Sequence, residues 1–428
     1  MNNRYILLFI IFVLFLSGCI NSLPIKHVPF SLDQKNKKIV IFFDGTANDE
    51  GSHTNISKLY NLVTLQNNPK INSIYIEGVG TNGKLAGAGL GWGIGNDVRQ
   101  AYLFLLENYH HKKSNKIYIF GFSRGAYSSR ILASLLYVAG IPDVKNLNKK
   151  ERKKIVKNIY SAYKGNKSII KRKRDVCKVL KKESCSKDDL PHSVEVEFMG
   201  LWDTVEALGV PDYKENNDIP NKQYFDQLCN IKKAAQALSL DDDRARIFTP
   251  IFLTSSHLTT ECSNKHINVE EVWFSGAHSD VGGGYRDTTI SGISLNWMLY
   301  QIKPYHLVPN GTKVYADPYS KTHNPEAGYW GLIYHNKSRS INDYIEKYHQ
   351  QGQKIKIHKS VIKRLECVKP KKYESRWFEK FPSCFKTYGN VKKFIKNNPS
   401  CSEFIDIVGD GYTDITCHKE TKNGYEDD

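Results

Sequence analysis

One short stretch constrains this chain more than any other. Residues 117–120 are β-branched and aromatic, and they lead into a Gly-x-Ser-x-Gly motif at residues 121–125. Apolar residues at three- to four-residue spacing follow from Ala126, a helical pattern. A strand, a sharp turn carrying a serine and then a helix is the layout of a nucleophile elbow. Glycines on both sides of the serine would let strand and helix backbones pass close together. We therefore predict Ser123 as a nucleophile.

Similar alternation continues on both sides of this motif. Strands are predicted at residues 39–43, 74–76, 194–202 and 269–274, and helices at residues 55–65, 97–109, 232–240 and 293–302. Strands that alternate with helices predict an α/β fold, with a mostly parallel sheet flanked by helices and right-handed crossovers.

A serine hydroxyl is a poor nucleophile unless a base and an orienting acid activate it. Asp203 follows the predicted strand that ends at residue 202, and His278 follows the one that ends at residue 274. Loops at the carboxyl ends of parallel strands meet in one crevice, so both side chains can reach Ser123. We predict His278 as general base and then general acid, and Asp203 as the residue that orients it.

Other residues compete for these roles. Asp280 and Asp44 are alternative acids, although Asp280 lies so close to the base that it more naturally braces its loop. His257 and His266 are the alternative bases nearest in the chain. His278 is favoured because it stands among small residues just past a buried-looking strand.

The oxyanion of an acyl-transfer intermediate needs backbone donors close to the serine. The N–H of Arg124 begins the predicted helix after Ser123, so it is the first candidate. The second is an N–H near Gly45 or Thr46, which follow the first predicted strand.

Two motifs suggest other chemistries and are set aside. Residues 78–83 read Gly-Val-Gly-Thr-Asn-Gly, formally a dinucleotide fingerprint, but glycines continue to Gly95 where a helix should already run. We expect a mobile loop near the mouth of the site instead. Asp44-Gly45-Thr46 resembles the strand end of aspartyl phosphatases, but Phe42 stands where their nucleophilic aspartate should be.

The N-terminus has the pattern of an export signal. Arg4 precedes an apolar run at residues 5–16, which is too short to span a bilayer comfortably. Leu16-Ser17-Gly18-Cys19 resembles a bacterial lipobox. We expect a lipoprotein signal peptide at residues 1–18, a lipidated Cys19 and a tether at residues 19–36. An uncleaved anchor is the alternative. Because Ile20 is not acidic, we expect the periplasmic side of the outer membrane if the cell is Gram-negative.

The remaining cysteines fit export. Without Cys19 the chain has eight, an even number that predicts disulfides in an exported protein, with the pairing left open. No Cys-x-x-Cys occurs and the spacings are too wide for a zinc knuckle, so we expect no metal. No cofactor is expected.

The formal charge of +17 is concentrated in one tract, because residues 145–187 hold 17 Lys/Arg against three acidic residues. This basic insertion, residues 145–190, is predicted to be either a solvated helical excursion or a lid that meets anionic headgroups. Nucleic acid is not an expected partner of an exported chain. The insertion lies within a predicted catalytic domain at residues 37–302. Residues 303–428, rich in aromatic and basic residues and with four cysteines, are predicted to form an irregular C-terminal subdomain.

Five blocks of sequence together resemble one family: the α/β-hydrolase domain of type VI secretion phospholipase effectors and their uncharacterised relatives. The blocks are residues 43–46, 78–81, 121–126, 201–205 and 276–283. The resemblance implies an α/β-hydrolase-like fold, a triad of Ser123, Asp203 and His278, and metal-free hydrolysis of carboxylic esters in glycerophospholipids. It does not extend over the last 125 or so residues.

Two departures qualify this resemblance. Injected effectors do not usually carry a signal peptide and lipobox, so we expect a resident envelope lipoprotein rather than a delivered toxin. The basic insertion also lengthens the interval between Ser123 and Asp203, so the lid shape and substrate of the family cannot be carried over to this chain. The alternatives are a non-catalytic binding or immunity-like lipoprotein on a hydrolase scaffold, and a secreted antibacterial lipase.

Overall fold

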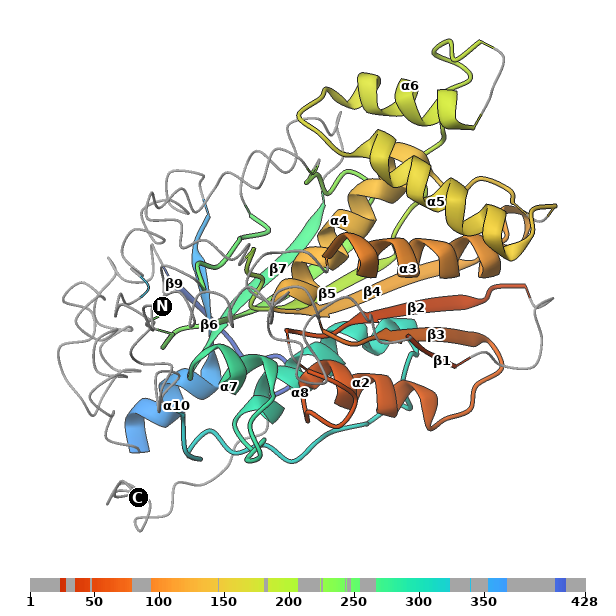
Figure 1. Ribbon diagram of the computed structural model, residues 1–428. Coiled ribbons are helices and arrows are strands. Elements are labelled where there is room, and N and C mark those ends of the chain that lie inside the picture. Colours follow the sequence, from red (N-terminus) through yellow and green to blue (C-terminus); the bar gives the residue numbers. More distant parts are fainter. Residues whose placement is uncertain are drawn as a thin grey trace, which may run out of the picture.

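A nine-stranded sheet runs through the centre of the molecule, with helices on both faces (Figure 1). The computed structural model describes residues 24–27, 35–46, 48–78, 94–144, 146–180, 184–206, 224, 226–242, 244, 248–254, 267–323, 339, 353–367 and 405–412.

Eight of the nine strands in the described residues are parallel, and among these nine the first alone runs antiparallel to its neighbour. In the order of the sheet they are β1 (Ile25–His27), β3 (Ile71–Ile76), β2 (Lys38–Phe43), β4 (Lys116–Phe122), β5 (Phe198–Trp202), β6 (Lys233–Ser239), β7 (Asn268–Phe274), β8 (Ile355–His358) and β9 (Ile405–Val408). After β2 the chain goes to β3 on one side, and β4 lies on the other. Loops after β2 and β4 therefore flank a topological switch point, where open α/β sheets bind ligands.

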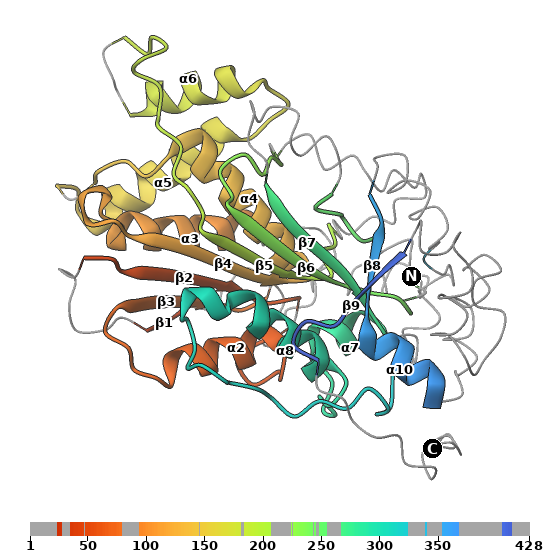
Figure 2. The ribbon, with the colours of Figure 1, turned by 180° about the vertical axis from the view of Figure 1, so that it is seen from behind.

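Two apolar layers bury the central strands. On one face lie α3 (Ile94–Asn108) and α4 (Arg124–Ala139), covered in turn by α5 (Lys149–Tyr163) and α6 (Ile169–Val179). On the other face lie α2 (Asn55–Thr64), the short α7 (His278–Gly282) and α8 (Ser291–Ile302) (Figure 2). The predicted mostly parallel α/β fold is confirmed.

The prediction of a helix at residues 232–240 is wrong, because Lys233–Ser239 form strand β6. Alanine favours a helix locally, but this segment is buried between β5 and β7, where small side chains fit beneath the layers on both faces. The position in the sheet overrides the local preference.

Two other segments join the sheet where the sequence predicted separate regions. Within the predicted tether, Ile25–His27 form β1 and extend the edge of β3, and Lys26 approaches Glu107 of α3 at 3.6 Å. In the predicted C-terminal subdomain, β8 and β9 continue the sheet beyond β7, and α10 (Lys359–Cys367) follows β8. The described part of that region is thus continuous with the catalytic sheet.

The basic insertion forms α5 and α6 on the outer side of α3 and α4, away from the sheet (Figures 1 and 2). A disulfide between Cys177 and Cys185 ties the end of α6 to the segment after it. Cys229 is disulfide-bonded as well. Among the described helices, none is long and apolar enough to cross a membrane. The predicted signal peptide and Cys19 lie outside the described residues.

Candidate active site

Strand β4, a tight turn and helix α4 hold Ser123 as the elbow motif predicts. Ser123 has φ 58° and ψ −126°, a strained conformation for a residue with a side chain. The turn has no room for bulk, because a Cβ on Gly125 would lie 2.3 Å from the carbonyl oxygen of Phe43. Ser123 N–H donates to Trp202 O at 3.0 Å, which fixes the turn against the end of β5.

Asp203 and His278, predicted from two separate strand ends, lie in contact. His278 Nδ1 is 2.5 Å from Asp203 Oδ2, and both side chains are buried. Asp203 follows β5 with a positive φ of 40°, and its N–H donates to Ala237 O on β6 at 2.8 Å. His278 begins α7 just after β7. Asp203 and His278 thus meet at the carboxyl ends of β5 and β7, one of them in a strained backbone conformation.

Two arginines balance the carboxylates around His278. Arg339 donates to both oxygens of Asp203, at 2.7 and 2.8 Å. Arg244 pairs with Asp242 at 2.6 Å, and Asp242 Oδ2 accepts the backbone N–H of His278 at 3.1 Å. Each carboxylate near the imidazole thus has its own guanidinium.

The pKa values follow from this arrangement. Burial would raise the pKa of Asp203, but the Arg339 guanidinium and His278 together hold it below its usual value. Burial lowers the pKa of His278, although the nearby Asp203 and Asp242 oppose that shift. His278 is therefore held as the neutral imidazole that a general base requires.

Aromatic rings enclose the imidazole. The ring centroid of Phe122, the residue before Ser123, lies 4.7 Å from that of His278, and the centroid of Phe248 lies 4.9 Å away. His278 Nε2 is buried and has no hydrogen-bond partner among the described residues. The structure thus brings Asp203 and His278 together and packs His278 beside the elbow, without a hydrogen bond from His278 to Ser123 in the described part.

The predicted oxyanion loop follows β2. Gly45 N–H donates to the carboxylate of Asp44 at 2.6 Å, so this donor is already engaged. Thr46 Oγ1 accepts a hydrogen bond from Arg124 Nε, which ties the loop to the start of α4. Of the loop donors named from sequence, the N–H of Thr46 is therefore the better candidate beside that of Arg124.

The competing acids have other partners. Asp44 Oδ2 accepts from Thr54 at 2.6 Å and from Tyr75 at 2.5 Å, and burial raises the pKa of Asp44 to about 7. Asp280 contacts His323 and accepts from the N–H of Ala277 at 3.0 Å, so it braces the start of α7 as predicted. The competing bases His257 and His266, and the glycine-rich loop at residues 79–93, lie outside the described residues.

Sequence reasoning missed Arg339 and Asp242. Asp242 comes after a strand that was predicted as a helix, so its position at a strand end was hidden. Arg339 lies in a region without strong periodicity, and no motif surrounds it. Only the fold brings the two residues to the site.

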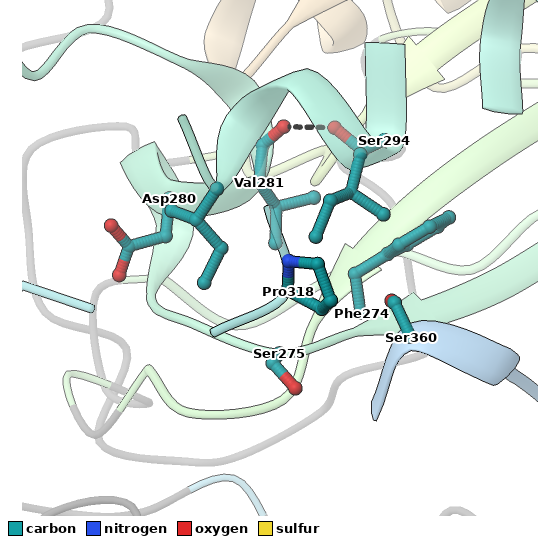
Figure 3. Close-up of a pocket in the computed structure, with 9 residues that line it drawn as sticks. Phe274, Ser275, Asp280, Val281, Ser294, Pro318 and Ser360 are labelled. Atoms are coloured by element: carbon teal, nitrogen blue, oxygen red, sulfur yellow. Dashed lines mark hydrogen bonds between the residues drawn. The ribbon is translucent and has the colours of Figure 1, made fainter. Parts of the chain in front are cut away.

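The described residues hold no group of three His, Cys, Asp or Glu side chains that could bind a metal ion. A small pocket lies between the end of β7, α7 and α8, lined among others by Phe274, Asp280 and Ile293 (Figure 3). Val281 O accepts from Ser294 Oγ beside it at 2.5 Å. Neither Ser123 nor His278 lines this pocket, so it is not the place where the acyl carbon would sit.

A family model described as "T6SS, Phospholipase effector Tle1-like, catalytic domain" matches residues 37–301. Among curated proteins, the uncharacterized protein YEL023C of Saccharomyces cerevisiae is 27% identical over 268 residues, which is 55% of this chain and 37% of the yeast protein.

Two solved structures are similar to parts of this chain. The Tle1 effector bound to the VgrG spike of the type 6 secretion system is 20% identical over 61% of this chain and 52% of that chain, with a TM-score of 0.33. Butyrate-bound esterase Est2 of Thermogutta terrifontis is 12% identical over 68% of this chain and 91% of that chain, with a TM-score of 0.35. The chain thus spans 37% of the length of the yeast relative and 52% of the length of the Tle1 effector.

Proposed function

This chain belongs to the family of type VI secretion Tle1-like phospholipase effector catalytic domains, and from that premise we propose that it hydrolyses carboxylic esters of glycerophospholipids with Ser123, His278 and Asp203. Residues 37–301 match the catalytic domain of this phospholipase family. The observation that carries the assignment of residues is the 2.5 Å contact between Asp203 and His278, next to a serine in an elbow turn.

In the proposed reaction His278 Nε2 takes the proton of Ser123 as the hydroxyl oxygen attacks the acyl carbon. Nδ1–H donates to Asp203, which fixes the tautomer and stabilises the imidazolium. The carbon–oxygen bond to the leaving alcohol then breaks, and that alcohol takes the proton from Nε2. Water, activated by the same nitrogen, hydrolyses the acyl-serine and releases the fatty acid.

The tetrahedral intermediate carries its negative charge on the former carbonyl oxygen. Arg124 N–H, at the start of α4, and the N–H of Thr46 are the proposed donors. Each such donor contributes about 3–4 kcal/mol to the transition state in comparable sites. The hydrogen bond from Arg124 Nε to Thr46 Oγ1 keeps the two donors at a fixed separation.

The insertion offers a surface for anionic lipid. Helix α5 carries six Lys/Arg and one acidic residue, and helix α6 carries five Lys/Arg and one acidic residue. Those acids are engaged, because Glu151 caps α5 and Asp175 pairs with Lys167 and Lys171. Lys153, Lys154 and Lys157 stay exposed on α5. We propose that this surface holds the enzyme on anionic bilayers, where each basic residue contributes about 1 kcal/mol.

The same insertion extends toward the site. Tyr127, one turn after Ser123, contacts the ring of Tyr224 at 6.1 Å between centroids. The ammonium of Lys164, at the end of α5, lies 5.5 Å from the centroid of Tyr224. These contacts link Lys164 of the insertion to the helix that begins at the serine, which fits a substrate drawn from a membrane.

We propose in addition that Cys19 carries the lipid anchor and that the protein resides on the periplasmic side of the outer membrane in a Gram-negative cell. The motif at residues 16–19 supports this. Feeding cells an alkyne-labelled fatty acid should label wild type but not a Cys19→Ala variant. Equal labelling of both would contradict the proposal.

The central experiment uses the full chain in detergent with phosphatidylethanolamine and phosphatidylglycerol of defined acyl chains, and identifies products by mass spectrometry. Ser123→Ala should abolish product formation, while Ser129→Ala should keep it. Ser129 is a matched control because its hydroxyl donates within α4, to Gly125 O at 2.9 Å. Equal hydrolysis by wild type and Ser123→Ala would refute the proposed function.

The membrane proposal has its own test, binding to vesicles that contain phosphatidylglycerol. Lys153→Glu with Lys154→Glu should weaken binding by tenfold or more, roughly, and most at low salt. Lys70→Glu with Lys112→Glu changes the charge equally at exposed positions outside the insertion and should weaken binding less. Equal losses would show that total charge, rather than this surface, attracts the bilayer.

A further inference from the structure

Arg339 lies beyond the segment that the family model matches, yet its side chain is fully buried against the acid of the site. Its two terminal nitrogens bind the two oxygens of Asp203, at 2.7 and 2.8 Å. Two parallel hydrogen bonds of this kind fix a carboxylate in orientation as well as in charge.

The guanidinium of Arg339 also donates to two backbone carbonyls beside the site. Nη1 donates to Ser239 O at 2.7 Å, at the end of β6, and Nη2 donates to Phe248 O at 2.7 Å. The ring of Phe248 packs against His278. Ser239 N–H donates to Asp203 Oδ1 at 3.0 Å. Arg339 therefore joins the acid, the end of a strand and one aromatic wall of the imidazole.

Stability alone does not account for such a pair. A buried ion pair can often be replaced by apolar side chains of similar volume without loss of stability, because desolvation of two charges offsets their attraction. A buried arginine on a residue assigned as the catalytic acid instead has a direct consequence for proton transfer, because it favours the ionised carboxylate and opposes positive charge on the neighbouring imidazole.

Among the described residues, the charged groups that act on His278 are Asp203, Asp242 and Arg244, and Arg339 acts in turn on both carboxylates. With both arginines present, the two carboxylates are neutralised and burial decides the state of the imidazole. Without Arg339 the balance around His278 would change by one full charge.

We propose that Arg339 is a positioning residue of the active site, which keeps Asp203 ionised and aimed at His278 Nδ1, so that the region after residue 302 completes the catalytic unit. This inference rests on the proposed function. It adds that Asp203, inside the segment matched by the family model, depends on Arg339, which lies outside that segment.

The test measures kcat, KM and the pH profile of kcat/KM for full-length Arg339→Met and Arg339→Lys, on a soluble ester. For Arg339→Met we expect kcat to fall roughly 10- to 100-fold, as when an outer partner of a functional histidine is removed, with KM nearly unchanged. The acidic limb of the profile should also move to lower pH, because an Asp203 that takes a proton no longer stabilises the imidazolium. A move to higher pH would show that Asp203 stays ionised without Arg339, and would overturn that part of the inference. Lysine should restore part of kcat, since it returns the charge without the paired geometry.

Arg364→Met is the matched control. Arg364 is a buried arginine of the same region, but it donates to Pro318 O and Ser320 O where Arg339 donates to Asp203. It should lower the thermal unfolding temperature without moving the pH profile. If Arg339→Met does not fold, Arg339→Lys alone decides, and wild-type kinetics for it would overturn the inference.

Two failures are distinguishable in the same assay. An active Ser123→Ala variant overturns the proposed function itself. An inactive Ser123→Ala variant together with Arg339→Met at wild-type kcat and an unmoved acidic limb overturns only the role of Arg339.

Discussion

Two Asp–His pairs meet at α7, one through His278 and the other through Asp280, and they differ in burial and in their other partners although their Asp–His distances are similar. Asp203 and His278 approach to 2.5 Å, and Asp280 and His323 approach to 2.6 Å, both through Nδ1. The side chain of His278 is 5% exposed, whereas that of His323 is 21% exposed and stacks on Tyr285.

The carboxylates differ as well. Asp203 pairs with Arg339, and its pKa is lowered. Asp280 accepts from the backbone N–H groups of Ala277 and His323, and burial raises its pKa. In Figure 3 the carboxylate of Asp280 points away from the other labelled side chains. A short Asp–His contact therefore does not define a catalytic pair. The guanidinium on the acid and the rings around the base make the difference.

The largest contrast should come from removing each imidazole. His278→Ala should lower kcat by about 10⁴-fold or more, because the proton acceptor is lost. His323→Ala should keep kcat within a few-fold and lower the unfolding temperature. Steady-state kinetics and thermal unfolding on both variants check this. Loss of activity in His323→Ala to the level of His278→Ala would place the second pair in the chemistry.

Replacing the two aspartates should give the same contrast, with a smaller loss of kcat than replacing the histidines. Asp203→Asn should reduce kcat by roughly 10³- to 10⁴-fold, because the amide can hold the imidazole in the other tautomer and leaves Arg339 without its anion. Asp280→Asn should instead cost about 1–3 kcal/mol of unfolding free energy, from weakened backbone hydrogen bonds at the start of α7. Denaturant unfolding measures the second quantity. A more active Asp203→Asn than Asp280→Asn would reverse the assignment.

The same pairs show how far the sequence could go. Ser123, Asp203 and His278 all follow buried strands, and apolar runs that end in small or polar residues are visible without a structure. That Asp280 braces its own loop could be predicted because it lies only two residues from His278 in the sequence. Its partner His323 and the arginine on Asp203 come from distant segments without a motif, and only the folded sheet brings them there.

The elements of the fold likewise divide into those that the sequence predicts and those that depend on the folded sheet. Parallel strands with continuous apolar runs, such as residues 39–43, were predicted. Strand β6 was predicted as a helix, because its alanines carry a local preference that burial between two strands overrides. Strands β8 and β9 depend on the open edge beyond β7, a property of the sheet rather than of their own residues.

The wild-type pH profile tests the electrostatics of the first pair. His278 acts as a base only when neutral, so kcat/KM should fall as the pH drops through its pKa. Burial lowers that pKa, so the midpoint of the acidic limb should lie below the usual value of 6.5. His323→Ala should show the same limb. A midpoint above 6.5 in wild type would mean that Asp203 and Asp242, rather than burial, dominate at His278.

The smallest expected effect concerns the rings that enclose each imidazole. Phe248→Ala opens one wall of His278 while its carbonyl can still accept from Arg339, so the base becomes better solvated. Its pKa should then rise toward 6.5, which moves the acidic limb upward by a fraction of a pH unit and lowers kcat a few-fold. Tyr285→Ala removes the ring 3.9 Å from His323 and should leave the limb in place, because that imidazole takes no proton in the reaction. If both variants leave the limb unmoved, enclosure by Phe248 is not what lowers the pKa of His278, and the charges alone separate the two pairs.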